Sequence, residues 1–296
     1  LGPEGSFSHQ AVTSLTDVEA VAYPSLEDLL SAVAASELDQ ALVPIENALE
    51  GTVSATIDGL VFDYDLVILQ EIVLPIHLHL LARPGVALDD IKSVRSYVHA
   101  LAQVRTYLHE RGFETVQTTS TSQAALDVAE SSEPWGAVGS SLAGELFGLV
   151  IAAPDIEDHP DNATRFVLVG RDAVAAPTGH DRSTIVCFQD ADRPGTLYAI
   201  LGRFAARDIN LTKLESRPTK QGLGDYCFVI EFEGHVADDV VADCLADLQA
   251  HLARVKFLGS YPVTGEAASD RRKEIAEARR SADQWIETIR ARVLPT

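Results

Sequence analysis

The residues best suited to chemistry stand at the start of an apolar stretch, where Asn162, Thr164 and Arg165 precede Phe166. They bring an amide, a hydroxyl and a guanidinium into four consecutive positions. A guanidinium suits two-point binding of a carboxylate, and a positioned hydroxyl can donate a hydrogen bond to a departing oxygen. The run Asn-Ala-Thr also matches a glycosylation acceptor. We disfavour that interpretation because the sequence shows no secretory signal.

Two further groups of polar residues occupy positions typical of ligand sites. Glu46 and Asn47 end the apolar run 43–47, and open α/β sheets bind ligands beyond the carboxyl ends of their strands. The turn-rich run GPEGSFS at 2–8 leads into a helical pattern, and a helix N-terminus attracts anions. A capping role is the alternative for Glu46, Asn47, Ser6 and Ser8.

Signatures of several common sites are missing from the sequence. It has no dinucleotide-binding or P-loop glycine pattern, and no HExxH, GxSxG or CxxC motif. His77 and His79 stand two apart in an apolar run, where core histidines are favoured over a metal pair. Cys187, Cys227 and Cys244 lack metal-ligand spacing and are expected to be buried small hydrophobes in a reducing compartment.

The elements that must position these residues alternate over the first 170 residues. Apolar runs predict strands at 41–45, 67–72, 76–82, 137–139 and 165–169. Helical stripes lie between them, and Ser25 stands at an N-cap position before one. Strands alternating with helices predict an α/β domain. Residues 171–182 have little periodicity and are expected to form a linker.

A different pattern follows the linker. Strands are predicted at 184–188, 210–215, 226–232 and 255–261, with helix faces at 197–204 and 240–248. The order βαββαβ predicts a second, smaller α+β domain. Apolar residues then recur every three or four positions over 275–293, and a C-terminal helix is expected over 268–294.

Charge and hydropathy exclude several classes of protein. The formal net charge is −21, which disfavours nucleic acid and anionic membranes as partners. Charged residues or histidines interrupt every apolar run before it reaches the roughly 18 residues of a membrane span. We therefore expect a cytoplasmic protein.

The chain resembles monofunctional prephenate dehydratases through four segments in the family's order: LGPEGSFSHQA at 1–11, VPIENALEGTVSATIDGL at 43–60, NATRFVLVG at 162–170 and LTKLESRP at 211–218. The resemblance implies a two-lobed catalytic domain over 1–172, like a type II periplasmic binding protein. One lobe would comprise 1–75 and 155–172, and the other 76–154. It also implies a ferredoxin-like ACT regulatory domain over 183–262.

The resemblance implies conversion of prephenate into phenylpyruvate, CO2 and water in phenylalanine biosynthesis. The reaction makes an aromatic ring, so it needs no metal or redox cofactor. The implied catalytic residues are Thr164, Asn47, Ser96 and Gln103. Thr164 would donate a hydrogen bond to the departing hydroxyl, and Arg165 would hold a substrate carboxylate. The other substrate-binding residues would be Ser6, Phe7, Ser8, Glu46 and Phe166. From the residues alone, Ser96 could equally be a helix cap and Gln103 part of a helix face.

The ACT resemblance implies that phenylalanine binds as an effector between subunits, which requires a homodimer and allows a homotetramer. The expected effector residues are Gly195, Thr196, Leu197, Asn210, Leu211, Glu215 and Ser216. Two departures from the family's pattern stand out: Tyr97 and Val98 replace its usual His-Pro after Ser96, and Thr196 replaces its usual Ala.

Three alternatives remain open on the sequence. Arogenate dehydratase differs in the substrate's side chain, where an amino group replaces the keto group. A non-catalytic amino-acid-sensing binding protein would use the same two folds. An interaction scaffold would have no small-molecule site.

Overall fold

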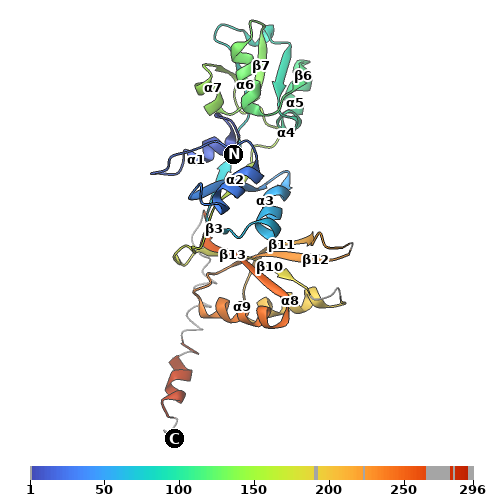
Figure 1. Ribbon diagram of the computed structural model, residues 1–296. Helices are drawn as coiled ribbons and strands as arrows, with labels where there is room; N and C mark the ends of the chain where they lie inside the picture. Colours follow the sequence, from blue (N-terminus) through green and yellow to red (C-terminus); the bar gives the residue numbers. More distant parts are fainter. Residues whose placement is uncertain (1, 190–192, 223, 265–280, 283, 293–296) are drawn as a thin grey trace. The chain divides into compact units, whose positions relative to one another are not determined.

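The computed structural model describes residues 2–189, 193–222, 224–264, 281–282 and 284–292. The chain divides into two compact units, Leu1–Ala173 and Val174–Thr296 (Figure 1). The first unit contains two sheets and the second contains one.

The first sheet carries the polar segments singled out above. Its strands run in the order β2-β1-β9-β3, and all pairs are antiparallel: β1 Gln40–Asn47, β2 Gly51–Thr52, β3 Val67–Pro75 and β9 Ala163–Gly170. The helices before and between these strands are α1 Phe7–Val12, α2 Leu26–Ala34, α3 Ser54–Asp58 and the π-helix η1 Gly59–Asp63. Because β9 pairs antiparallel with β1, the polar residues that begin β9 meet those that end β1.

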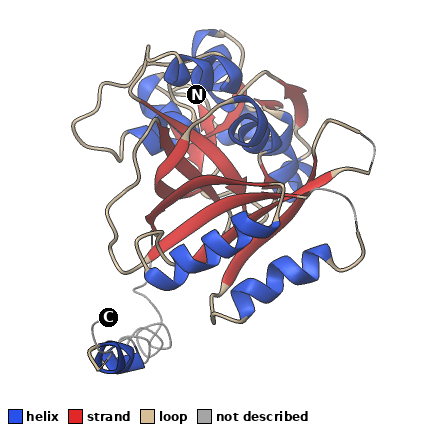
Figure 2. Cartoon of the chain, turned by 60° about the horizontal axis from the view of Figure 1, so that its bottom comes forward, coloured by secondary structure: helices blue, strands red, loops and turns tan. Residues whose placement is uncertain are grey.

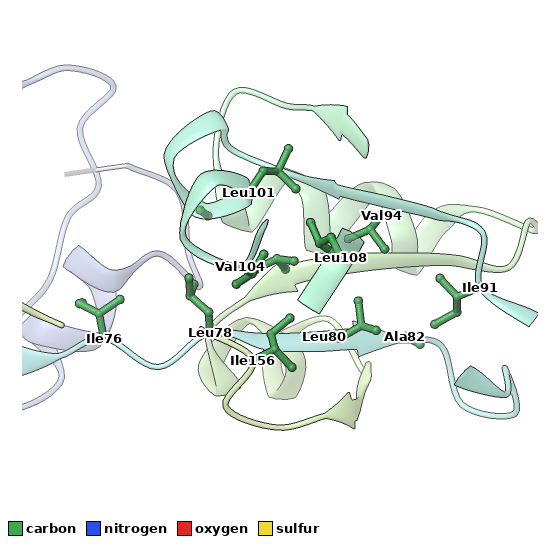
Figure 3. Packing of buried hydrophobic residues seen from close by; sticks show 12 residues of the cluster. Ile76, Leu78, Leu80, Ala82, Ile91, Val94, Leu101, Val104, Leu108 and Ile156 are labelled. Carbon is green, nitrogen blue, oxygen red and sulfur yellow. The ribbon is translucent and has the colours of Figure 1, made fainter. Parts of the chain in front are cut away.

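The second sheet is mixed and has the order β6-β5-β7-β4-β8. Its strands are β4 His79–Ala82, β5 Ser93–Ser96, β6 Glu114–Gln117, β7 Trp135–Gly139 and β8 Val150–Ala153. Its helices are η2 Leu88–Asp90, α4 Val98–Gln103, α5 Arg105–Arg111, α6 Thr121–Glu130 and α7 Ser141–Leu146. Figure 3 shows the apolar core in which Val104 and Leu108 meet Leu80 and Val94.

Side-chain caps explain where four helices of this unit begin. Each of four serines accepts a hydrogen bond from the backbone N–H three residues ahead: Ser6, Ser25, Ser120 and Ser140. Such a bond satisfies one of the N–H groups that a helix leaves open at its start. The N-cap predicted at Ser25 is confirmed.

The strand predicted over 76–82 is wrong in its first half. β3 ends at Pro75 and β4 begins at His79, so residues 76–78 connect the two sheets. The apolar pattern runs on because Ile76, Leu78 and Leu80 are buried in one cluster (Figure 3). Burial alone therefore does not distinguish this connection from a strand.

The second unit has the predicted βαββαβ order, which confirms the ferredoxin-like fold class. The elements are β10 Asp181–Phe188, α8 Thr196–Ala205, β11 Leu211–Pro218, β12 Tyr226–Glu233, α9 Asp239–His251 and β13 Arg254–Pro262. Its antiparallel sheet has the order β11-β12-β10-β13. Figure 2 shows both helices against one face of the strands.

The C-terminal helix expected over 268–294 falls largely outside the described residues. Within that range the structure describes 281–282 and 284–292, of which 281–282 and 284–290 are helical. No helix in the described part of the chain is long and apolar enough to cross a membrane.

Candidate active site

Asn47 and Thr164 lie opposite each other on the neighbouring strands β1 and β9. The Asn47 side chain donates from Nδ2 to Thr164 Oγ1 at 2.9 Å and to Asn162 Oδ1 at 3.0 Å. Its Oδ1 accepts from the backbone N–H groups of Leu49 and Glu50, at 3.0 and 3.1 Å. Those two bonds fix which way the side-chain amide faces, because backbone N–H groups can donate to its oxygen but not to its nitrogen. Thr164 Oγ1 therefore accepts from Asn47, and its own hydrogen points elsewhere.

A chain of hydrogen bonds joins this pair to the second sheet. Asn162 is 2% exposed, and its Nδ2 donates to Gln103 Oε1 at 3.0 Å. Gln103 ends α4, and its Nε2 lies 3.5 Å from Glu50 Oε1. The other Glu50 carboxylate oxygen lies 3.2 Å from His99 Nδ1. The predicted residues Asn47, Thr164 and Gln103 are thus linked through Asn162.

Ser96 is not part of that chain of contacts. It ends β5, is fully buried, and its Oγ donates to the Val138 carbonyl at 2.7 Å. The N-cap residue of α4 is Tyr97, so the interpretation of Ser96 as a helix cap is wrong. Its hydrogen bond ties β5 to β7 at the point where α4 begins.

Arg165 and Thr164 lie on opposite faces of β9, since successive residues of a strand alternate. Phe166 shares the Thr164 face and packs against α1. The Arg165 guanidinium lies between two carboxylates of the protein itself: Nη2 is 2.8 Å from Glu46 Oε2, and Nη1 is 3.5 Å from Glu71 Oε2. Arg165 and Glu71 are both buried. Glu46 therefore pairs with Arg165.

The N-terminal residues form the loop and helix that the sequence predicts. Ser6 caps α1, because its Oγ accepts from the His9 N–H at 3.2 Å. Gly5 has a φ of +79°, and a Cβ there would lie 3.1 Å from the backbone of α7, so this position requires glycine. Phe7 packs against the core clusters of both sheets, and Ser8 is partly buried.

The predicted effector residues of the second unit lie at the start of α8 and on the edge strand β11. Gly195 is the N-cap residue of α8 and has a φ of +88°. The Thr196 hydroxyl donates to a preceding backbone carbonyl at 2.9 Å, and Leu197 packs against the core. Asn210 donates to a glutamate of β12 at 3.1 Å, and Leu211 contacts the core on the side of the helices.

Glu215 and Ser216 follow each other on β11 and so point to opposite faces. Glu215 contacts the two basic residues that share its face, Lys213 at 3.8 Å and Arg217 at 3.1 Å. Ser216 is exposed. One small ligand on one face of the edge strand would therefore contact only one of the two side chains.

The histidines and cysteines left outside the predicted site differ in their surroundings. His79 is buried, as predicted, whereas His77 is half exposed and lies beside Glu157. All three cysteines are buried thiols that are not in disulfides. Burial raises the pKa of Cys187 to about 12 and that of Cys244 to about 11, so both thiols keep their protons at neutral pH.

The sequence marks Asn162 as a candidate without a specific role and does not mark Glu50 or His99, yet all three lie beside Thr164 or Gln103 in the structure. Asn162 precedes the Thr-Arg pair directly, Glu50 follows Asn47 by three positions, and His99 precedes Gln103 by four. That last spacing puts His99 and Gln103 on one side of α4. Glu50 could have been found from its position in the segment 43–60, which also contains Asn47.

Each of the two units matches the model of a known family. The family model for prephenate dehydratase matches residues 1–174, and that for the ACT domain matches 183–250. A prephenate dehydratase of Amycolatopsis methanolica is 40% identical over 295 residues, covering 97% of this chain and 96% of that protein.

Two solved structures resemble the whole chain. The prephenate dehydratase of Arthrobacter aurescens in complex with L-Phe has a TM-score of 0.86 and 38% identity, covering 98% of this chain and 97% of that one. GqqA, described as a novel type of quorum quenching acylase, has a TM-score of 0.79 and 28% identity, covering 91% of this chain and 97% of its own.

Proposed function

The chain belongs to the prephenate dehydratase family, and from that premise we propose how its residues convert prephenate into phenylpyruvate, CO2 and water. The reaction breaks two bonds of the substrate ring. The bond to the ring carboxylate breaks and CO2 leaves, while its electron pair enters the ring. The bond to the C4 hydroxyl breaks in turn, and that oxygen leaves as hydroxide, which takes a proton from solvent to become water. The gain of aromaticity drives the step, so the protein must mainly assist the departing oxygen.

Thr164 assists that oxygen by donating its hydroxyl hydrogen. The observation that carries this assignment is the 2.9 Å bond from Asn47 Nδ2 to Thr164 Oγ1. It makes the oxygen an acceptor toward Asn47 and leaves the hydrogen for the substrate. A threonine hydroxyl is too weak an acid to protonate the leaving group alone. Its contribution is a hydrogen bond that strengthens as negative charge develops on the departing oxygen.

Asn162 and Gln103 are positioning residues in this account. Amides hold hydrogen bonds in fixed directions but do not exchange protons readily, so the chain from Asn47 to Gln103 orients Thr164 and does not feed it protons. Glu50 and His99 end the chain with a carboxylate and an imidazole. Ser96 supports the start of α4, which carries Gln103.

The contacts of Arg165 favour a structural contribution over the predicted binding of a substrate carboxylate. A substrate carboxylate would have to displace Glu46, and it would lie on the face of β9 opposite Thr164. As a proposal, the substrate lies instead on the Thr164 face, toward the N-terminus of α1, where Ser6, Phe7 and Ser8 lie.

Phenylalanine feedback belongs to the second unit. The relative from Arthrobacter aurescens was solved with L-Phe, and this chain has the same ACT domain. We place the effector near the start of α8 and the exposed edge of β11, shared between two subunits of a homodimer or homotetramer. A cytoplasmic location fits three buried cysteines that are not in disulfides.

The test is phenylpyruvate formation by the purified protein from prephenate, with arogenate as the competing substrate and phenylalanine as the effector. We expect turnover of prephenate and its suppression by phenylalanine. Turnover of arogenate alone would replace the substrate assignment. Binding of phenylalanine with no turnover of either substrate would favour the sensor alternative.

A further inference from the structure

The chain passes between the two sheets of the first unit twice, and the two passages lie side by side. Residues 76–78 lead from β3 to β4, and 154–162 lead from β8 back to β9. The Ile156 N–H donates to the Leu78 carbonyl at 2.9 Å. Both side chains are buried in the same core, as Figure 3 shows.

The neighbours of these two residues form a cluster of metal-ligating groups. His77 flanks Leu78, and Asp155 and Glu157 flank Ile156. His77 Nδ1 lies 2.9 Å from Glu157 Oε1 and 3.8 Å from Asp155 Oδ1. One ligand atom from each of the three residues lies within 4.8 Å of the others. Such spacing suits ligands around one cation, because atoms bound at about 2.1 Å lie roughly 3–4 Å apart.

The surroundings hold the three side chains ready for a cation. Glu157 Oε2 accepts from the Leu78 N–H at 3.0 Å, which fixes the carboxylate. His79 Nδ1 accepts from the Asp155 N–H at 3.1 Å and orients the third ligand.

We propose that His77, Asp155 and Glu157 bind a divalent transition-metal cation, such as Zn²⁺ or Co²⁺, that joins the two passages. An imidazole nitrogen with two carboxylate oxygens suits these cations, whereas Mg²⁺ and Ca²⁺ prefer oxygen ligands alone. His77 and Asp155 are about half exposed or more, so water can complete the coordination. The site shares no residue with the catalytic chain, and the cation takes no part in the elimination.

The cation would act on the connection between the sheets. The next residue along the second passage, Asp158, donates from its N–H to the Gln103 carbonyl at 2.7 Å. The passage that carries two ligands thus also contacts the end of α4, where the catalytic chain enters the second sheet. A bound cation would restrict the movement of both passages against each other.

Titration with Co²⁺, followed by its visible absorption, tests the site in the intact protein. Wild type should show one site that His77→Gln and Asp155→Asn each weaken by about 100-fold, since direct ligands matter at least as much as the groups behind them. His251→Gln is the matched control, because His251 also lies 3.0 Å from a carboxylate, that of Asp247, on the surface. Equal affinity in wild type and His77→Gln would overturn the proposal, as would equal competition by Mg²⁺.

Hydrogen exchange with Zn²⁺ gives a second readout that is local. The amides of Leu78, Asp155 and Ile156 should exchange several-fold more slowly with Zn²⁺, and His77→Gln should abolish the difference. Unchanged exchange in these residues at saturating Zn²⁺ would contradict a cation that joins the two passages.

Discussion

At the scale of single residues, the proposed role of the Thr164 hydroxyl depends on which atom of Asn47 faces it. Two backbone N–H groups occupy Asn47 Oδ1, so the amide nitrogen must face the hydroxyl. The donor and acceptor identities of these atoms, and not their distances alone, decide the direction of the bond between Asn47 and Thr164. A change that keeps the size of the side chain but reverses its polarity is therefore informative.

Asn47→Asp is that change. The carboxylate can still accept from Leu49 and Glu50, but toward Thr164 it presents an acceptor, and the hydroxyl then donates to Asp and not to the substrate. We expect kcat for phenylpyruvate formation to fall by about 100- to 1,000-fold. The control is Gln117→Glu on the exposed strand β6, which adds the same charge and should leave kcat unchanged. A kcat of Asn47→Asp close to wild type would remove the polarity argument.

Arg165 gives a second prediction at this scale. A structural role predicts a loss of stability when Arg165 is replaced, whereas binding of a substrate carboxylate predicts a raised KM. Arg165→Met leaves Glu71 buried without its cation, which should cost about 3–5 kcal/mol in the free energy of unfolding. The double variant with Glu71→Gln should recover part of that loss. Denaturant unfolding measures both. A raised KM with unchanged unfolding would instead support the predicted carboxylate-binding role.

At the scale of elements, the sequence predicted which residues form the site better than it predicted which face of a strand each side chain lies on. Asn47 and Thr164 were both identified, and the pairing of β1 with β9 joins them. Arg165 was grouped with Thr164 because the two are adjacent. β9 is buried on both faces, so no alternation of apolar and polar residues marked which neighbour points which way.

Long-range pairing limited the rest of the prediction. Short strands such as β5 and β6 have few apolar residues of their own, and no local pattern predicts the order of strands in a sheet. Asn162 and Gln103 are 59 positions apart, and only the fold shows their hydrogen bond. The βαββαβ unit was predicted well because each of its elements is long and periodic.

The buried thiols of the second unit give a prediction for its sheet and helices. The pKa of Cys187 rises from about 9 to about 12 on folding, mainly through burial. Between these values the unfolded thiol loses its proton while the folded one keeps it, so stability is full below pH 9 and falls as the pH rises toward 12. The slope is about 1.4 kcal/mol per pH unit for one such group. Cys187→Val should unfold with a smaller dependence on pH between 9 and 12, and an identical dependence would contradict the shift.

At the scale of the whole molecule, the net charge of −21 sets the response to salt. Like charges repel across the folded chain, and salt screens them. Raising the ionic strength from about 0.01 M to 1 M shortens the Debye length from about 30 Å to 3 Å. We expect a higher Tm in NaCl at the higher strength. A Tm that falls with NaCl would mean that attractive pairs, such as those of Arg207 with Asp243 and Asp247, outweigh the net repulsion.

The central claim is that the Thr164 hydroxyl assists the departing oxygen. The most direct measurement is kcat for phenylpyruvate release from prephenate by Thr164→Val and Thr164→Ser, with denaturant unfolding of each as the check on folding. Valine keeps the shape and removes the hydroxyl, while serine keeps the hydroxyl. The account predicts a loss of about 100- to 1,000-fold for valine and a far smaller loss for serine, both folded. A folded valine variant with the kcat of wild type would contradict it.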